Sequence, residues 1–382
     1  MKLKLVIFVV LLQLLYACQE KNNPEQPTDG QTSISCSPST KLVTKADEQF
    51  VVTLKSDAPW SATADKAWVG LSSEDGQGDA YITIYVYSGA DDTAKVLFSN
   101  SKGSATLFIK RRLGQLTSEF SISASKKIHF SKGNLQYQAS TKTWRFAENQ
   151  YDYVGDKSNG NVYVGGTKSN NEYIRDSYSG WIDLFGWGTG DNPTIATTNR
   201  ADYTTFVDWG TNAISNGGNV PNTWRTLTKE EWSYLFTERT NASKLFGFGQ
   251  VDNVNGLILL PDNWVAPANV SFTASTSFIG STSTIDDNYD HAVNNFSDNT
   301  YSIATWDLME SAGAVFLPAA GGRSGKSFES DFFFRLIDGG YWSSSSDSNS
   351  AIDLSFTKLY LYYAQFINPC AGCSVRLVRD IE

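Results

Sequence analysis

The chain has 382 residues, enough for two or three domains, and 31 Lys and Arg stand against 40 Asp and Glu, a net charge of −9. Without a basic footprint it is unsuited to nucleic acid, so we expect no such partner. Only two histidines are present, and no HExxH or GxSxG motif occurs, so we expect no cofactor and no enzymatic activity.

The N-terminus has the pattern of an export signal. In residues 1–17, Lys2 and Lys4 precede an apolar run of about a dozen residues, shorter than the ~20 that span a bilayer. The tetrad LYAC, which ends at Cys18, resembles a bacterial lipobox, and this implies that Cys18 is lipidated. Residues 18–32 are polar and contain proline, which predicts a flexible tether. We therefore expect a surface-exposed protein that a lipid anchors to the outer membrane; a plain secretory signal with a chance cysteine is the alternative.

Residues 33–111 contain short alternating segments separated by turn residues. Such spacing predicts an all-β, Ig-like sandwich, with Trp60 and Trp68 packed between its sheets. Cys36 is expected to be a small, buried, apolar side chain.

Four segments carry a resemblance to the BACON domain of Bacteroidota surface proteins: SCSPSTKLV, the pair PW and AWVGLS, GQGDAYITIYV and ATLFIKR. Members of that family often accompany glycan-processing proteins. The resemblance implies a spacer, or an accessory carbohydrate binder of a polysaccharide-utilisation system in which Trp60 stacks on sugar.

Residues 119–382 mix both kinds of secondary structure. A helix is predicted in TLTKEEWSYLF, where Thr228 and Glu231 form a capping-box pattern. A second helix is predicted in ATWDLMESAG, with Gly313 as its C-terminal stop. Strands are predicted in KIHFSKGNLQYQ, TWRFAE, NGLILLP, GAVFLPA, AIDLSF and SVRLV. These elements predict an α+β domain.

A second resemblance covers most of this domain. The segments GWIDLFGWGTGDNP, WRTLTKEEWSYLFTERTNA, VNGLILLPDNW, AGAVFLPAAGGRSG, GYWSSSS and CSVRLVR occur in this order. Together they resemble the C-type-lectin-fold domains of Bacteroidota, a fold related to the variable proteins of diversity-generating retroelements and to formylglycine-generating enzymes. The resemblance implies a C-type-lectin-like domain that binds a protein or glycan ligand through its last strands.

The alternation of apolar and polar residues locates the predicted ligand-binding face. In residues 351–357, Ile352, Leu354 and Phe356 are expected in the core, and the polar side chains between them are expected in solvent. Residues 341–368 are dense in Tyr, Ser, Asn and Asp, as in an antibody paratope. The predicted ligand-binding residues are Asp347, Ser348, Asn349, Asp353, Ser355, Thr357, Tyr360, Tyr362, Tyr363, Gln365 and Asn368.

The C-terminal motif NPCAGC has the spacing of redox sites and zinc half-sites. In the relatives that generate formylglycine, a cysteine pair binds copper. An enzyme of that type, with copper on Cys370 and Cys373, is the alternative to a binding protein, although the spacing and position of these two cysteines do not match that pattern. An exported location permits a short-loop disulfide between them; the alternative is that one thiol faces the binding surface. Arg376, in SVRLV, is expected to be half-buried and paired with a carboxylate.

Overall fold

The computed structural model describes residues 34–45, 47–155, 162–163, 174–275, 278–280, 296–328, 338–357 and 360–381. The predicted leader, Cys18 and the tether lie outside these residues. In the described part the chain is mostly β-strand, in several sheets, with two α-helices. No helix in these ranges is long and apolar enough to cross a membrane.

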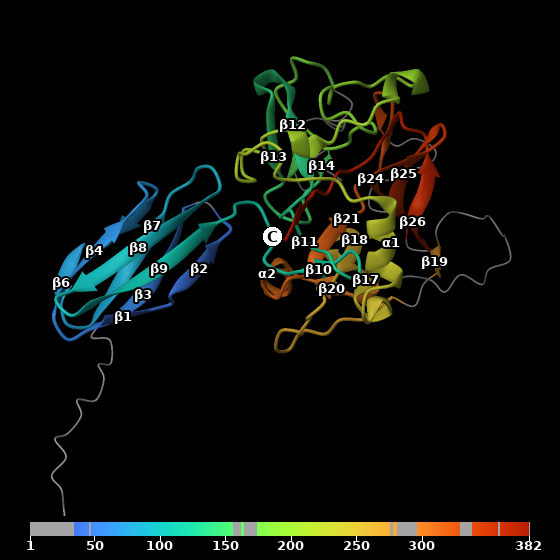
Figure 1. Ribbon diagram of the computed structural model, residues 1–382. Coiled ribbons are helices and arrows are strands. Elements are labelled where there is room, and N and C mark those ends of the chain that lie inside the picture. Colours follow the sequence, from blue (N-terminus) through green and yellow to red (C-terminus); the bar gives the residue numbers. More distant parts are fainter. Residues whose placement is uncertain are drawn as a thin grey trace, which may run out of the picture.

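Strands β1 to β9 form a two-sheet sandwich (Figure 1). One sheet has the order β1 (Ile34–Ser37), β3 (Glu48–Ser56), β7 (Ala80–Val86) and β5 (Val69–Leu71). The other has the order β2 (Thr40–Val43), β9 (Gly103–Arg111), β8 (Asp92–Asn100), β4 (Pro59–Ala64) and β6 (Asp75–Gln77). Alternate residues of both sheets enter one shared core, as the period of two requires.

Both tryptophans lie where the sequence predicts. Trp60 is buried in the sandwich core, and its indole Nε1 donates a hydrogen bond to the carbonyl of Gly78 at 3.0 Å. Trp68 packs against the same core and lies under the guanidinium of Arg111, 4.1 Å from the ring centroid. Cys36 is partly buried against this core.

The C-terminal part contains four larger sheets. Two of them have three strands, in the orders β10 (Phe120–Ser121), β11 (Lys127–Phe130), β28 (Val378–Asp380) and β13 (Thr143–Phe146), β12 (Leu135–Gln138), β16 (Trp181–Ile182). The third has the order β20 (Thr300–Tyr301), β17 (Phe246–Val251), β18 (Val254–Leu259), β21 (Val315–Pro318). The fourth has the order β19 (Phe278–Gly280), β26 (Tyr360–Ile367), β25 (Ser350–Phe356), β24 (Gly339–Asp347). Because β28 pairs with β11, the end of the chain returns to the beginning of this part.

Shorter elements complete the fold. The small sheets are β14 (Val154–Gly155) with β15 (Val162–Tyr163), and β23 (Ser327–Phe328), β22 (Arg323–Ser324) and β27 (Ala371–Gly372). Single 3-10 turns occur at Ala139–Thr141, Arg200–Tyr203, Trp209–Thr211, Ala242–Lys244 and Phe296–Asp298.

Both predicted helices are present. Helix α1 (Lys229–Thr237) begins with the expected capping box between Thr228 and Glu231. Helix α2 (Ile303–Ser311) is capped by the side chain of Ser302, and Gly313 follows it with φ of +101°. A Cβ at Gly313 would meet the side chain of Ser118, so glycine is required there by conformation and by space.

The prediction of a strand in SVRLV is largely wrong. In SVRLV only the final residue belongs to β28, because the backbone groups before it bond to separate elements: Ser374 to Gly340, and Val375 to Leu135. Arg376 is fully buried rather than half-buried. Its guanidinium donates to the neutral oxygens of Gln150, Phe316 and Asn134 instead of a carboxylate, and burial lowers its pKa to about 10.

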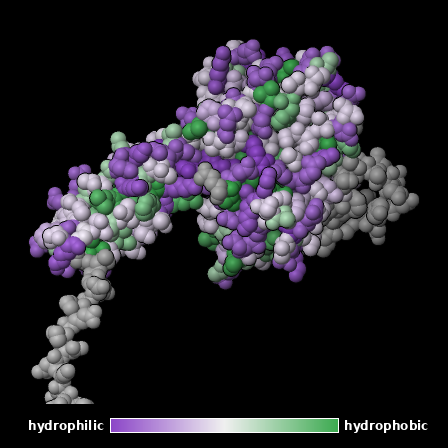
Figure 2. Space-filling model, viewed as in Figure 1, coloured by the Kyte–Doolittle hydropathy of each residue, from purple (hydrophilic) through white to green (hydrophobic). Residues whose placement is uncertain are grey.

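The loop before β8 of the sandwich forms a hydrogen bond to the C-terminal part. The backbone N–H of Asp91 donates to the carbonyl of Gly218 at 3.0 Å, and its Oδ1 accepts from the N–H of Leu113 at 2.8 Å. Figure 2 shows the two parts in contact, with apolar residues among the hydrophilic ones on the sandwich surface.

Candidate functional site

The predicted binding face is built on the sheet β19-β26-β25-β24. In Figure 1 its strands β24 to β26 lie on the side of the molecule away from the sandwich, next to α1. The apolar set of β25 is buried as expected: Leu354 and Phe356 belong to the core that also holds Trp232 of α1.

The expectation that the polar side of β25 faces solvent is wrong. Asp353 has no exposed surface, and Ser355 and Thr357 are each 7% exposed. Strand β25 lies between β24 and β26, and core residues cover both of its faces. These three side chains are therefore not directly available to a macromolecular ligand.

Asp353 occupies an unusual position for a carboxylate. Its Oδ1 has no hydrogen-bond partner, and its Oδ2 lies 3.9 Å from the Sγ of Cys373, which is also fully buried. Burial raises the pKa of both groups well above their ordinary values. Burial therefore disfavours the charged form of each group.

The cysteine pair forms no disulfide. Cys370 and Cys373 are both free and both buried, so neither alternative proposed for them holds. The Sγ of Cys370 lies 3.5 Å from the carbonyl oxygen of Thr198, and burial raises the pKa of its thiol. No group of three or more His, Cys, Asp or Glu that could hold a metal ion occurs among the described residues.

The tyrosines of β26 divide between the two faces of the sheet. Tyr360 and Tyr362 lie side by side, with ring centroids 4.4 Å apart, and both are partly exposed. Between Asp353 and Ser355 the pairing shifts, because β26 contains one extra residue opposite this stretch. Tyr363 follows Tyr362 directly, so it points to the opposite face and packs against the core beside α1; the shift brings Phe366 to the same face. Burial raises the pKa of Tyr360 to about 12.

The other predicted residues lie at the turn between β24 and β25, within β26 and just after β26. Asp347, Ser348 and Asn349 are exposed at the turn between β24 and β25, where Ser348 has φ of +54°. Gln365 and Asn368 are partly exposed; the Oδ1 of Asn368 accepts from the N–H of Cys370 at 3.2 Å.

A groove of about 510 Å³ lies between α1 and β26. We call it the α1/β26 groove. Its lining from the helix side is Lys229, Glu230, Ser233 and Glu238, and from the sheet side Ile352, Tyr363, Ala364 and Phe366. Only Tyr363 was predicted as a site residue. The amphipathic pattern of α1, with its polar side opposite the buried residues, could have indicated this wall.

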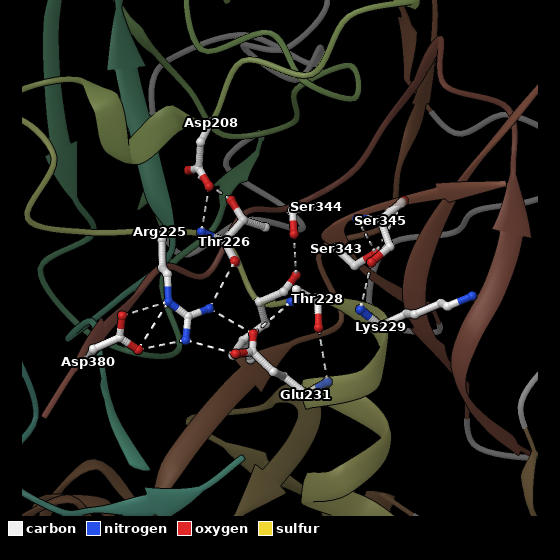
Figure 3. Close-up of polar contacts among 11 residues, drawn as sticks. Asp208, Arg225, Thr226, Thr228, Lys229, Glu231, Ser343, Ser344, Ser345 and Asp380 are labelled. Carbon is white, nitrogen blue, oxygen red and sulfur yellow. Dashed lines mark hydrogen bonds and ion pairs between the residues drawn. The ribbon is translucent and has the colours of Figure 1, made fainter. Parts of the chain in front are cut away.

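The first turn of α1 is held firmly, as Figure 3 shows. The backbone N–H of Lys229 donates to Ser345 Oγ on β24 at 3.0 Å, and the N–H of Ser344 donates to the carbonyl of Leu227 at 2.9 Å. The side chain of Glu231 reaches back to the N–H of Thr228 at 2.9 Å. These contacts fix the helix next to the sheet and so fix the wall of the groove.

Arg225 connects this helix to the end of the chain. Its guanidinium donates to both carboxylate oxygens of Glu231, at 2.7 and 2.8 Å, and to Asp380 on β28 (Figure 3). Burial alone would lower the pKa of Arg225, but the bonds to Asp380 and Glu231 outweigh it and raise the pKa. The bidentate geometry gives the contact directional rigidity.

Comparison with known proteins identifies no family. No family model matches the chain, and no curated protein matches it. A Bacteroides ovatus GH5 xyloglucanase in complex with a heptasaccharide aligns at 18% identity and a TM-score of 0.21 over 22% of this chain and 20% of that chain. SSP-19, an MSP-domain-like protein of Caenorhabditis elegans, aligns at 13% identity and a TM-score of 0.18 over 20% of this chain and 97% of that chain. The chain thus spans a small part of the xyloglucanase, and matches with such scores carry no information on function.

Proposed function

We propose that the chain is a surface lipoprotein that binds a protein or glycan ligand through the last strands of a C-type-lectin-like domain. In this proposal the lipid on Cys18 anchors the protein to the outer membrane, and the sandwich, which resembles a BACON domain, acts as a spacer. The domain displays its ligand-binding face on the side remote from the sandwich.

One observation carries the proposal: four aromatic side chains of β26 reach the surface. Tyr360 and Tyr362 are partly exposed on one face of the sheet; on the other face Tyr363 is partly exposed and Phe366 is 45% exposed, and both line the α1/β26 groove. Aromatic side chains supply much of the binding energy at protein interfaces, and exposing them to water without a ligand is unfavourable.

The proposal can be tested by screening the mature chain against glycan arrays and panels of cell-surface proteins. The double variant Tyr360→Ala/Tyr362→Ala should weaken any hit by about tenfold or more. Tyr81→Ala is the matched control, because it removes an exposed tyrosine from the sandwich. Binding that survives the double variant, with an unchanged unfolding midpoint, would rule out this face.

A second candidate, accessory glycan binding by the sandwich, is favoured by its outer surface rather than by Trp60, which is buried. Tyr81 and Tyr85 lie on β7 and are 79% and 38% exposed, and Tyr87, which follows the strand, is 51% exposed. Tyr81 and Tyr85 point to one face, opposite Thr53 and Gln49 of β3. Sugar rings stack on such uncharged aromatic surfaces.

The two candidates are separated by the same pair of variants. If a polysaccharide binds the full chain through the sandwich, Tyr81→Ala should reduce its retention in affinity gel electrophoresis. The double variant in β26 should leave that retention unchanged.

A further inference from the structure

We propose that the α1/β26 groove binds a small organic cation, which consists of a protonated amine or a guanidinium group on an apolar chain. The groove lies on the face of the sheet opposite the Tyr360 and Tyr362 pair, so this site goes beyond the proposed function. Its volume of about 510 Å³ lies within the range of ~300–1,000 Å³ that is typical of small-molecule sites. The occupant is therefore a free small molecule.

A bulge in β26 builds the sheet side of the groove. Between its pairings with Asp353 and Ser355, strand β26 has two residues, Tyr363 and Ala364, where β25 has one. Bulges of this kind change the direction in which side chains point and are frequent next to functional sites. Both residues of the bulge line the groove together with Phe366. In this wall the small side chain of Ala364 separates two aromatic residues along the strand.

The two aromatic residues favour a cation in the groove. The faces of Tyr and Phe rings carry a negative electrostatic potential, and a cation within about 6 Å of a ring centroid gains ~0.5–2 kcal/mol. Tyr363 is partly exposed and Phe366 is 45% exposed, and both line the groove. Ile352 and Ala364 add apolar surface to this wall, against which the chain of the ligand can pack.

The helix side of the groove supplies the negative charge. Glu230, whose side chain is 69% exposed, and the exposed Glu238 outnumber Lys229 on this wall. Lys229 approaches Glu230 at 3.8 Å, whereas Glu238 has no ion pair among the described contacts. Glu238 also lies at the C-terminal end of α1, where the helix dipole favours a positive charge. Charge therefore selects a cation, and the net charge of −9 attracts it from a distance.

The helix wall is largely preformed. The capping box and the contact between Lys229 and Ser345 hold α1 against the sheet before any ligand arrives. The bidentate pair of Arg225 with Glu231 adds a further restraint on the first turn of the helix. Binding therefore does not require ordering of the helix, which would weaken the affinity for a small ligand.

The test titrates the mature chain at neutral pH with three ligands of equal chain length in saturation-transfer difference NMR. Hexylamine is protonated under these conditions, hexanol is uncharged and hexanoate is negatively charged. Hexylamine should bind about tenfold more tightly than hexanol, because only the cation interacts favourably with the aromatic rings and with Glu238. Hexanoate should bind more weakly than hexanol, because the carboxylates of the helix wall repel it.

Variants locate the site. Glu238→Gln should weaken hexylamine binding about threefold, and Phe366→Ala about tenfold. Ala364→Trp, which fills the groove, should abolish it. Glu74→Gln is the matched control, because it neutralises an exposed carboxylate in the sandwich and should leave binding unchanged. Circular dichroism and the unfolding midpoint check that each variant is folded, and the exposed position of Glu238 keeps the test open if a variant in β26 does not fold.

Absence of hexylamine binding, or equal binding of hexylamine and hexanol, would overturn the inference. So would hexylamine binding that Glu238→Gln weakens no more than Glu74→Gln does. A concentration-dependent dimer in sedimentation that Ala364→Trp abolishes would also overturn it, since a second copy of the chain would then occupy the groove.

The double variant Tyr360→Ala/Tyr362→Ala separates this inference from the proposed function. It should leave hexylamine binding unchanged, because these tyrosines lie on the other face of the sheet. Loss of hexylamine binding in the double variant would place the cation at the tyrosine pair and overturn the inference.

Discussion

Asp91 of the sandwich and Arg379 of β28 form an ion pair across the junction between the two parts, with 2.7 Å between Oδ2 and Nη1 and each side chain 10% exposed. The guanidinium of Arg379 also lies over the ring of Trp224 and donates to Gln115. A buried pair of this kind fixes orientation, because neither charge can easily be left alone.

Replacement of Asp91 by Asn should therefore separate the two parts. The variant leaves Arg379 buried without its counter-charge, at a cost of about 3 kcal/mol. We expect calorimetric unfolding at a lower temperature and in two resolved transitions. Asp79→Asn is the control, because it breaks the exposed pair with Lys55 in the same sandwich and should change little. Equal effects of the two variants would contradict a special role for Asp91.

The cap of α1 makes a second prediction. Thr228→Ala removes the acceptor for the N–H of Glu231 and should destabilise the chain by about 1 kcal/mol in urea unfolding. Thr237→Ala, at the exposed end of the same helix, is the control. If both variants lose the same stability, capping does not hold the groove wall.

Local sequence patterns predicted helix α1 and the strands of the sandwich well. The capping box of α1 and the alternation in the sandwich depend on residues a few positions apart, so the sequence displays them directly. Alternation failed at β25 because a period of two cannot tell a half-exposed strand from a central strand covered on both faces. Asp353 is buried by residues that surround it in space, and the period of two does not reveal these neighbours.

Contacts distant in sequence could not be predicted. The pairing of Asp91 with Arg379, and the approach of α1 to β26, depend on how sheets pack. The one-residue shift in β26 likewise brought Phe366 to the same face as Tyr363, where strict alternation would have placed it with Tyr360 and Tyr362.

The free cysteines predict low thiol reactivity. Burial raises the pKa of Cys36, Cys370 and Cys373, so little thiolate is present at neutral pH. In a chain expressed from residue 33, Ellman's reagent should react with Cys36 before the other two. All three thiols should react in denaturant. Recovery of one thiol only would reveal a disulfide between Cys370 and Cys373 and contradict their free state.

Asp353 predicts a loss of stability as the pH rises. Its folded pKa lies above its unfolded value of about 3.9, so the folded state keeps a proton that the unfolded chain releases. This contribution is fully present below about pH 4 and declines by at most about 1.4 kcal/mol per pH unit until the folded pKa is passed. Asp353→Asn cannot release that proton, so its stability relative to the parent should increase between about pH 5 and about pH 8. Urea unfolding at both pH values measures this, with Asp347→Asn as the exposed control in the same hairpin. If the difference in unfolding free energy between Asp353→Asn and the parent does not change with pH, Asp353 is ionised in the folded protein.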